Sequence, residues 1–207
     1  MARYAAVEVR VPAMVRPLAR TQQMRSAFGE ALLRQVEALE APERDAIVGQ
    51  LAEETREHYR RAKAIGWSPM TMHMDVSDCI RAVIGSTRNI DLWRETMADL
   101  TRRPMLSGFL RHIGTRLGVG PGTLYRQNAR LWKYLCRDVG HLSAEVGSNE
   151  TTVELVDFPA REHQFPCFVE GLDGCLRGLV AGLDVTPRVE VVAVDLDAGN
   201  VRYHITW

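Results

Sequence analysis

The feature that most constrains the fold is a change of hydrophobic period near the end of the 207-residue chain. Between residues 165 and 183 the apolar positions recur every three or four residues, which predicts one long amphipathic helix. The chain then alternates apolar and polar residues along 189–196 and 201–207, with Val201, Tyr203 and Ile205 on one face. Because only a short turn separates these two runs, they are expected to pair as an antiparallel hairpin against which the helix packs.

A second alternating pair precedes that helix. Residues 142–146 and 153–155 alternate on either side of the sequence GSNE at 147–150, which is typical of a β-hairpin. Residues 141–207 therefore predict the order β-β-α-β-β.

The first 140 residues are mainly helical in pattern, after a short opening strand predicted within 5–11. Helical spacing over 24–39 and again over 43–62 predicts an antiparallel helical hairpin. Residues 67–74 are interpreted as a methionine-rich loop, and further helices are expected near 76–84, 91–100, 105–117 and 123–139. We predict an α+β fold in which a helical N-terminal half, 1–140, packs on a four-stranded antiparallel sheet from 141–207. Neither a linker nor a shift in composition divides the chain, so 1–207 is expected to form a single domain.

The charge balance, the N-terminal sequence and the cysteine content argue against nucleic-acid-binding, secreted and membrane-spanning proteins. Lysine plus arginine and aspartate plus glutamate both number 26, so the electrostatic footprint of a nucleic-acid-binding protein is lacking. The N-terminal sequence carries no long uncharged apolar run, and neither a signal peptide nor a membrane span is expected. The four cysteines include no CxxC pair, which favours free thiols in a cytoplasmic protein.

The sequence predicts no catalytic residues. It contains no G-x-S-x-G nucleophile elbow. The segment GVGPG at 118–122 precedes a predicted helix, but it lacks the lysine of a phosphate-binding loop and is interpreted as a helix-start turn. A non-enzymatic role is therefore expected.

A metal site has one weak candidate set. His163 and Cys167 are four residues apart, and Cys175 lies two turns further along the same predicted helix. Zinc needs three or four converging ligands, and the other histidines are scattered. Buried apolar packing is therefore preferred for both cysteines, and no metal is predicted.

The predicted helix also carries four glycines at intervals of three or four residues. Glycine costs up to about 1 kcal/mol at an interior helical position, so Gly171, Gly174, Gly178 and Gly182 require an explanation. Close backbone approach to a sheet or to another subunit is preferred over room for a ligand.

The C-terminal block resembles one superfamily. Its pattern-rich residues are FPCFVEG at 165–171, RVEV at 188–191 and VRYHITW at 201–207, within a likeness that extends over roughly 45–207. The superfamily includes the 4-vinyl-reductase-type domain, the haem-nitric-oxide-binding domain and the TRAPP trafficking subunits. The likeness is strongest to a related bacterial family of unknown function. The resemblance implies a fold in which helices pack on a four-stranded antiparallel sheet. Relatives bind a hydrophobic small molecule, haem or an acyl chain between helices and sheet, or they dimerise as scaffolds.

Two departures from the superfamily bear on its cofactors. The haem branch requires an axial histidine and a Tyr-x-Ser-x-Arg clamp, and the nearest string here, YRQNAR at 125–130, lacks that pattern. Relatives of the vinyl-reductase type carry cysteines near the last strands, where this chain has none. No cofactor is therefore predicted, although an unidentified hydrophobic small molecule is compatible with the pattern.

We predict a non-enzymatic sensor or adaptor with an apolar pocket between helices and sheet. The alternative is a homodimeric protein-interaction scaffold without a ligand, and a metal or haem protein is the third hypothesis. A homodimer is expected in either of the first two cases, with signalling or scaffold proteins as further partners. The candidate pocket residues are aromatic or methionine side chains: Trp67, Met70, Met72, Trp93, Phe109, Trp132 and Phe168.

Overall fold

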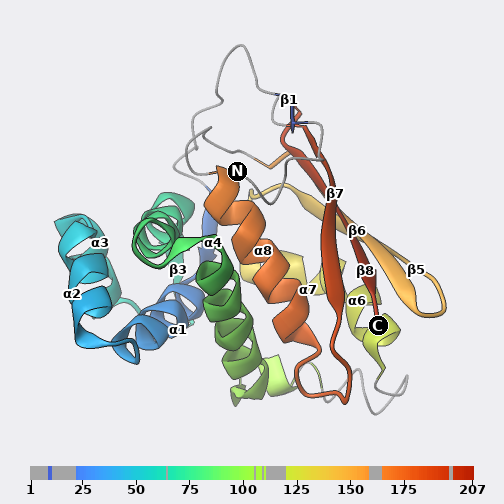
Figure 1. Cartoon of the computed structure of the whole chain (residues 1–207), viewed down its shortest axis with the longest axis horizontal. Coiled ribbons are helices and arrows are strands. Elements are labelled where there is room, and N and C mark those ends of the chain that lie inside the picture. The colour runs from blue at the N-terminus through green and yellow to red at the C-terminus, as the bar shows by residue number, and fades with distance from the viewer. Residues whose placement is uncertain are drawn as a thin grey trace.

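A computed structural model describes residues 9–10, 22–63, 65–104, 106–108, 110, 120–158, 165–195 and 198–207. Helices lie on one side of an antiparallel sheet (Figure 1). The helices are α1 (Ser26–Glu37), α2 (Ala41–Gln50), α3 (Glu53–Arg61), α4 (Met70–Arg102), α6 (Pro121–Arg126), α7 (Asn128–Leu135) and α8 (Phe165–Leu179). The strands are β1 (Val9–Arg10), β2 (Gln23–Arg25), β3 (Trp67–Pro69), β4 (Cys136–Arg137), β5 (His141–Val146), β6 (Glu150–Val156), β7 (Arg188–Asp195) and β8 (Asn200–Thr206).

The main sheet has the strand order β1-β7-β8-β6-β5. The hairpins β5–β6 and β7–β8 are antiparallel, and β6 pairs antiparallel with β8 at the centre. This confirms the predicted α+β fold with four antiparallel strands and the β-β-α-β-β ending. A fifth strand, β1, adds a short parallel pairing to β7 within the predicted opening strand, whose other residues lie outside the described part of the chain.

The alternation along β8 separates a buried face from an exposed one. Val201, Tyr203 and Ile205 are at most 2% exposed. The Tyr203 hydroxyl donates a hydrogen bond to the Val169 main-chain oxygen at 3.0 Å, which joins the sheet to α8. On the opposite face Arg202 forms an ion pair with Glu154 of the neighbouring strand. Within the described part of the chain, the helices therefore cover the face of the sheet that carries Val201, Tyr203 and Ile205.

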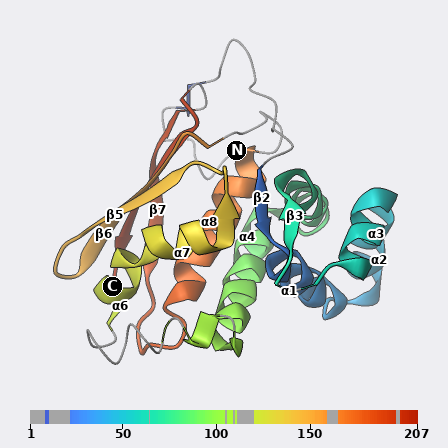
Figure 2. The same ribbon diagram turned by 180° about the vertical axis from the view of Figure 1, so that it is seen from behind.

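Helix α8 lies between the sheet and α4 (Figure 1). Its glycines permit this packing, because a Cβ at Gly174 would meet the Ile90 main-chain oxygen and one at Gly178 the Arg94 main-chain oxygen. The close approach is thus to α4 of the same chain, whereas the sequence had suggested a sheet or another subunit. Figure 2 shows α7 in front of α8, and both α6 and α7 lie next to β5.

The prediction for residues 67–100 is wrong in part. Trp67–Pro69 is the strand β3, and the methionine-rich segment after it forms the first turns of α4 instead of a loop. Methionine is a good helix former, and the fixed φ of Pro69 suits the residue before the first turn. The two helices predicted over 76–84 and 91–100 are one element, interrupted only at Gly85, whose φ is 77°. Only glycine adopts that angle without strain, so it marks a kink.

Two other predicted helices are divided. The helix predicted over 43–62 is split into α2 and α3, since Leu51 has an extended ψ of 135°. The helix predicted from 123 to 139 ends at Leu135, after a break at Gln127. The chain then enters β4, which pairs with β2, while β2 also pairs with β3. This three-stranded sheet was not predicted, because strands of two or three residues are too short to show an alternation.

No helix within the described ranges is long and apolar enough to cross a membrane.

Candidate functional site

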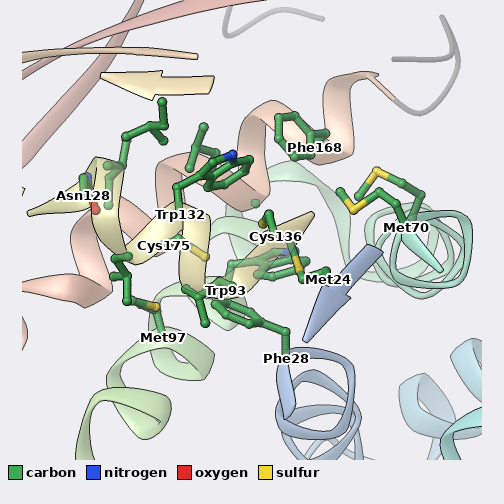
Figure 3. A pocket seen from close by; sticks show the side chains of 17 residues that line it. Met24, Phe28, Met70, Trp93, Met97, Asn128, Trp132, Cys136, Phe168 and Cys175 are labelled. Atoms are coloured by element: carbon green, nitrogen blue, oxygen red, sulfur yellow. The ribbon is translucent and has the colours of Figure 1, made fainter. Parts of the chain in front are cut away.

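An apolar cavity of about 60 Å³ lies where α4, α7 and α8 meet the three-stranded sheet of β2, β3 and β4, called the small sheet below (Figure 3). The described residues that line it are Met24, Phe28, Met70, Met74, Trp93, Met97, Asn128, Leu131, Trp132, Leu135, Cys136, Leu142, Phe168, Gly171, Leu172, Cys175 and Leu176. The volume is enough for a few heavy atoms and well below the roughly 300–1,000 Å³ of sites for drug-sized ligands. Any ligand of the cavity in this form is therefore small.

Helical spacing brings the lining side chains to the cavity. On α4, Met70 and Met74 are one turn apart before the kink, and Trp93 and Met97 are one turn apart after it. Residues four apart lie on the same face of a helix, so each pair points in one direction. The kink at Gly85 therefore separates two parts of α4 that both reach the cavity.

The predicted pocket residues divide into three groups. Met70, Trp93, Trp132 and Phe168 line the cavity, although that placement alone does not assign them a ligand. Trp67 and Met72 are not among its lining residues. Phe109 lies outside the described residues.

Trp67 belongs to a different feature, the outer face of the small sheet. The guanidinium carbon of Arg25 lies 4.0 Å from the Trp67 ring centroid, and that of Arg137 lies 3.8 Å from it. Arg25 also donates a hydrogen bond to the Ile65 main-chain oxygen at 2.6 Å. Cation–π contacts of this kind join the three short strands. The indole is therefore part of the framework around the cavity.

Sequence reasoning missed several lining residues that come from the small sheet and from α8. Met24 and Cys136 face each other across β2 and β4 in register, and Cys175 reaches the same space from α8. Cys175 lies two helical turns from Phe168, and this spacing could have indicated that both side chains share one face of the helix. The pairing of Met24 with Cys136 joins residues more than 100 positions apart and had no local signal.

The cavity lining is uncharged. Among the described lining residues, the two indole N–H groups are already satisfied: Trp93 Nε1 donates to Ser77 Oγ at 3.2 Å, and Trp132 Nε1 donates to the Val139 oxygen at 2.9 Å. That leaves the amide of Asn128 as the one strongly polar group of the described lining. An ionised ligand would lose its hydration here without gaining a counter-charge.

The cysteines are protonated thiols. Burial raises the pKa of both Cys167 and Cys175 to about 12, and it raises the pKa of Cys79 to about 11. The pKa of Cys136 is raised as well, by burial and then by the nearby Cys175. Because the thiolate is the reactive form, these groups are poor nucleophiles at neutral pH.

We therefore expect the native protein to resist thiol reagents at pH 8. A pKa higher by about three units lowers the thiolate fraction roughly a thousandfold. Ellman's reagent should react slowly with the native protein and quickly with all four cysteines in guanidinium chloride. A native cysteine that reacts at the rate of a model peptide would contradict this description.

Of the candidate metal set, the two cysteines lie within the described residues. His163 lies outside the described residues, Cys175 faces the cavity, and Cys167 is not among its lining residues. Within the described ranges no group of three or more histidine, cysteine, aspartate or glutamate side chains could hold a metal ion.

A histidine lies close to the cavity without reaching it. His73 is on α4, fully buried, with its ring edge-on to Tyr59 at 5.6 Å between centroids. Burial lowers the pKa of His73 to about 3, and the main chain of Met24 opposes that effect only in part. The imidazole is therefore neutral in the folded protein at any pH above this value.

This burial sets a pH dependence of stability. The unfolded chain protonates His73 below its ordinary pKa of 6.5, whereas the folded chain does not until about pH 3. Stability is therefore complete above 6.5 and falls as the pH decreases toward 3, at about 1.4 kcal/mol per unit. In urea titrations at pH 7.5 and 5, we expect wild type to lose roughly 2 kcal/mol more than a His73→Leu variant. Equal losses in the two proteins would show that His73 is not the cause.

No protein-family model matches the sequence, and no curated protein sequence matches it. Solved structures do share the fold. An Fe(II) unliganded H-NOX protein from K. algicida superposes with a TM-score of 0.58 at 12% identity, covering 88% of this chain and 95% of that one. A variant of the T. tengcongensis H-NOX domain gives 0.54 at 13% identity, covering 88% and 97%. A Cs H-NOX variant gives 0.56 at 13%, covering 88% and 96%.

The chain therefore has an H-NOX-like fold, the fold of haem-nitric-oxide-binding domains. This confirms the haem-nitric-oxide-binding part of the resemblance at the level of architecture. At this identity the likeness concerns the fold alone.

The described lining of the cavity does not fit haem. It contains no histidine for an axial bond and no arginine, lysine or tyrosine to pair with the propionates. The cavity volume of about 60 Å³ is also far smaller than a porphyrin requires. The described lining of the cavity thus lacks the side chains that would hold a haem iron and its propionates.

Proposed function

We propose that this chain is a sensor-type domain that binds a small, uncharged, mainly apolar molecule in the cavity between α4, α7 and α8. The observation that carries the proposal is the apolar cavity itself, lined by aromatic and sulfur-containing side chains. Protein interiors are otherwise packed with few voids larger than a water molecule. Apolar cavities of this kind stay dry and take up xenon or small hydrocarbons in other proteins.

The role of a sensor follows from which elements reach the cavity. Met74 contributes from before the kink at Gly85 and Met97 from after it, while Leu172 contributes from α8. A ligand that contacts all three would favour one relative arrangement of the two parts of α4. Binding energy that differs between two arrangements is the physical basis of a ligand-driven switch.

Xenon tests the proposal because it is apolar, small and visible in diffraction. Crystals pressurised with xenon should show one site between Trp93, Trp132 and Cys175. A Cys175→Leu variant, which fills the space from α8, should lose that site. Cys79→Leu is the matched control, since Cys79 is a buried cysteine on α4 that does not line the cavity.

Three outcomes would count against the proposal. Failure of xenon to enter the wild-type cavity would mean that side-chain motion closes it. A protein that takes up no small molecule and sediments as a stable dimer would favour the scaffold alternative. Stoichiometric binding of added haem, with an iron-ligand spectrum, would contradict the haem-free assignment.

A further inference from the structure

Resting on the proposed function, we infer that the ligand carries one hydrogen-bond acceptor, such as a carbonyl oxygen, which Asn128 recognises. Asn128 is the first residue of α7 and is only 7% exposed, so its amide is removed from bulk water. Its side chain lines the cavity. In Figure 3 it lies at one end of the group of labelled side chains, on the opposite side of Trp132 from Phe168.

The amino group of Asn128 is the unusual feature. Its Nδ2 atom is buried and has no hydrogen-bond partner among the described residues. Buried donors are nearly always paired, because an unpaired one loses its bonds to water without replacement. Because Asn128 lines the cavity, a rotation of its side chain would present this unpaired donor to a ligand or a water molecule that supplies the acceptor.

The surroundings restrict that acceptor to a neutral group. Trp93 and Trp132 use their N–H groups within the protein, and no charged side chain is among the described lining residues. A carboxylate or phosphate would meet a single neutral donor and an otherwise apolar wall, which cannot replace its hydration. A small ketone, aldehyde or nitrile presents one acceptor on an apolar body and matches both parts of the site.

Acetone and isobutene form a matched pair of probes, because they share a heavy-atom skeleton and differ in O against CH₂. Dissociation constants for both would be measured by NMR titration of wild type and of Asn128→Leu. We expect the preference for acetone over isobutene to fall roughly tenfold in the variant, since one hydrogen bond in an apolar site is lost. Isobutene should bind both proteins with similar affinity.

A second readout does not depend on a substitution. In wild type, acetone should shift the side-chain amide signal of Asn128, and isobutene should leave it in place.

The outcomes separate this inference from the proposed function. Binding of isobutene with no loss of acetone preference in Asn128→Leu would overturn the inference alone, and would mean that a water molecule satisfies Nδ2. Absence of binding by either probe to wild type would overturn the proposed function itself.

Discussion

Replacing Glu170 by alanine is expected to destabilise the protein by about 3–5 kcal/mol, the cost typical of breaking a buried ion pair. The Glu170 carboxylate is fully buried on α8. It accepts hydrogen bonds from Arg81 Nε at 3.0 Å, Ser86 Oγ at 2.6 Å and Asn89 Nδ2 at 3.0 Å. Without the carboxylate the buried Asn89 amide would be left unpaired, and the partly exposed Arg81 and Ser86 would lose their partner. The measurement is the free energy of unfolding from urea titration.

The position of these donors gives the substitution a second expected effect. Arg81 precedes the kink at Gly85, whereas Ser86 and Asn89 follow it, so one carboxylate holds both parts of α4. Amide hydrogen exchange should therefore become faster on both sides of the kink in Glu170→Ala.

Glu154→Ala is the control for this prediction. Glu154 pairs with Arg202 on the outer face of the sheet, where both side chains are partly exposed. Exposed pairs contribute about 1 kcal/mol or less. If Glu170→Ala cost no more than Glu154→Ala, the buried network would not hold α4 to α8.

The second large effect is expected from Gly174→Ala and Gly178→Ala. Each added methyl group would overlap a main-chain oxygen of α4, that of Ile90 or Arg94 respectively. Main-chain atoms of a helix cannot move aside as a flexible side chain can, so α4 and α8 must separate. We expect a loss of about 2–3 kcal/mol for each variant, by urea titration, even though alanine is the better helix former.

Gly49→Ala provides the matched control for a glycine within a helix. A Cβ at Gly49 of α2 would have no atom within 4 Å. That variant should be neutral or more stable by up to about 1 kcal/mol. Comparable losses in all three variants would show that close approach to α4 is not the reason for the glycines of α8.

The second half of the fold could be predicted from the sequence because each element there shows its own period. The alternation of Val201, Tyr203 and Ile205 identified a strand with one buried face, and the structure buries that face.

Residues 67–102 were less predictable. The helix α4 contains a glycine with positive φ, so its pattern shifts at Gly85 and reads as two separate helices. The cation–π contacts around Trp67 connect three separate strands, and no local window contains them.

The sequence could predict those residues of the candidate site that lie on the apolar face of a single helix. Trp93, Trp132 and Phe168 are large apolar residues on amphipathic helices, and all three face the cavity. Asn128 was not selected, because a lone asparagine inside the helix predicted over 123–139 is ordinarily a solvated residue. Its significance depends on burial beside an apolar space, which only the three-dimensional arrangement reveals.

An H-NOX-like fold at 12–13% sequence identity does not by itself determine a ligand. The neighbours in structure are described as haem proteins, whereas the described cavity lining here offers hydrophobic contact and one amide. The same layers of helix and sheet can thus enclose different chemistry once the lining side chains change.

The most direct test of the proposed binding site uses the methionines as reporters. Met24, Met70, Met74 and Met97 line the cavity, whereas Met72 lies on α4 outside it. In a protein labelled at the methionine methyl groups, isobutene should shift the NMR signals of the four lining residues and leave Met72 unchanged. Aromatic rings beside the cavity make those shifts large enough to measure. Unchanged signals from the four lining methionines at saturating isobutene would contradict the existence of a binding site there.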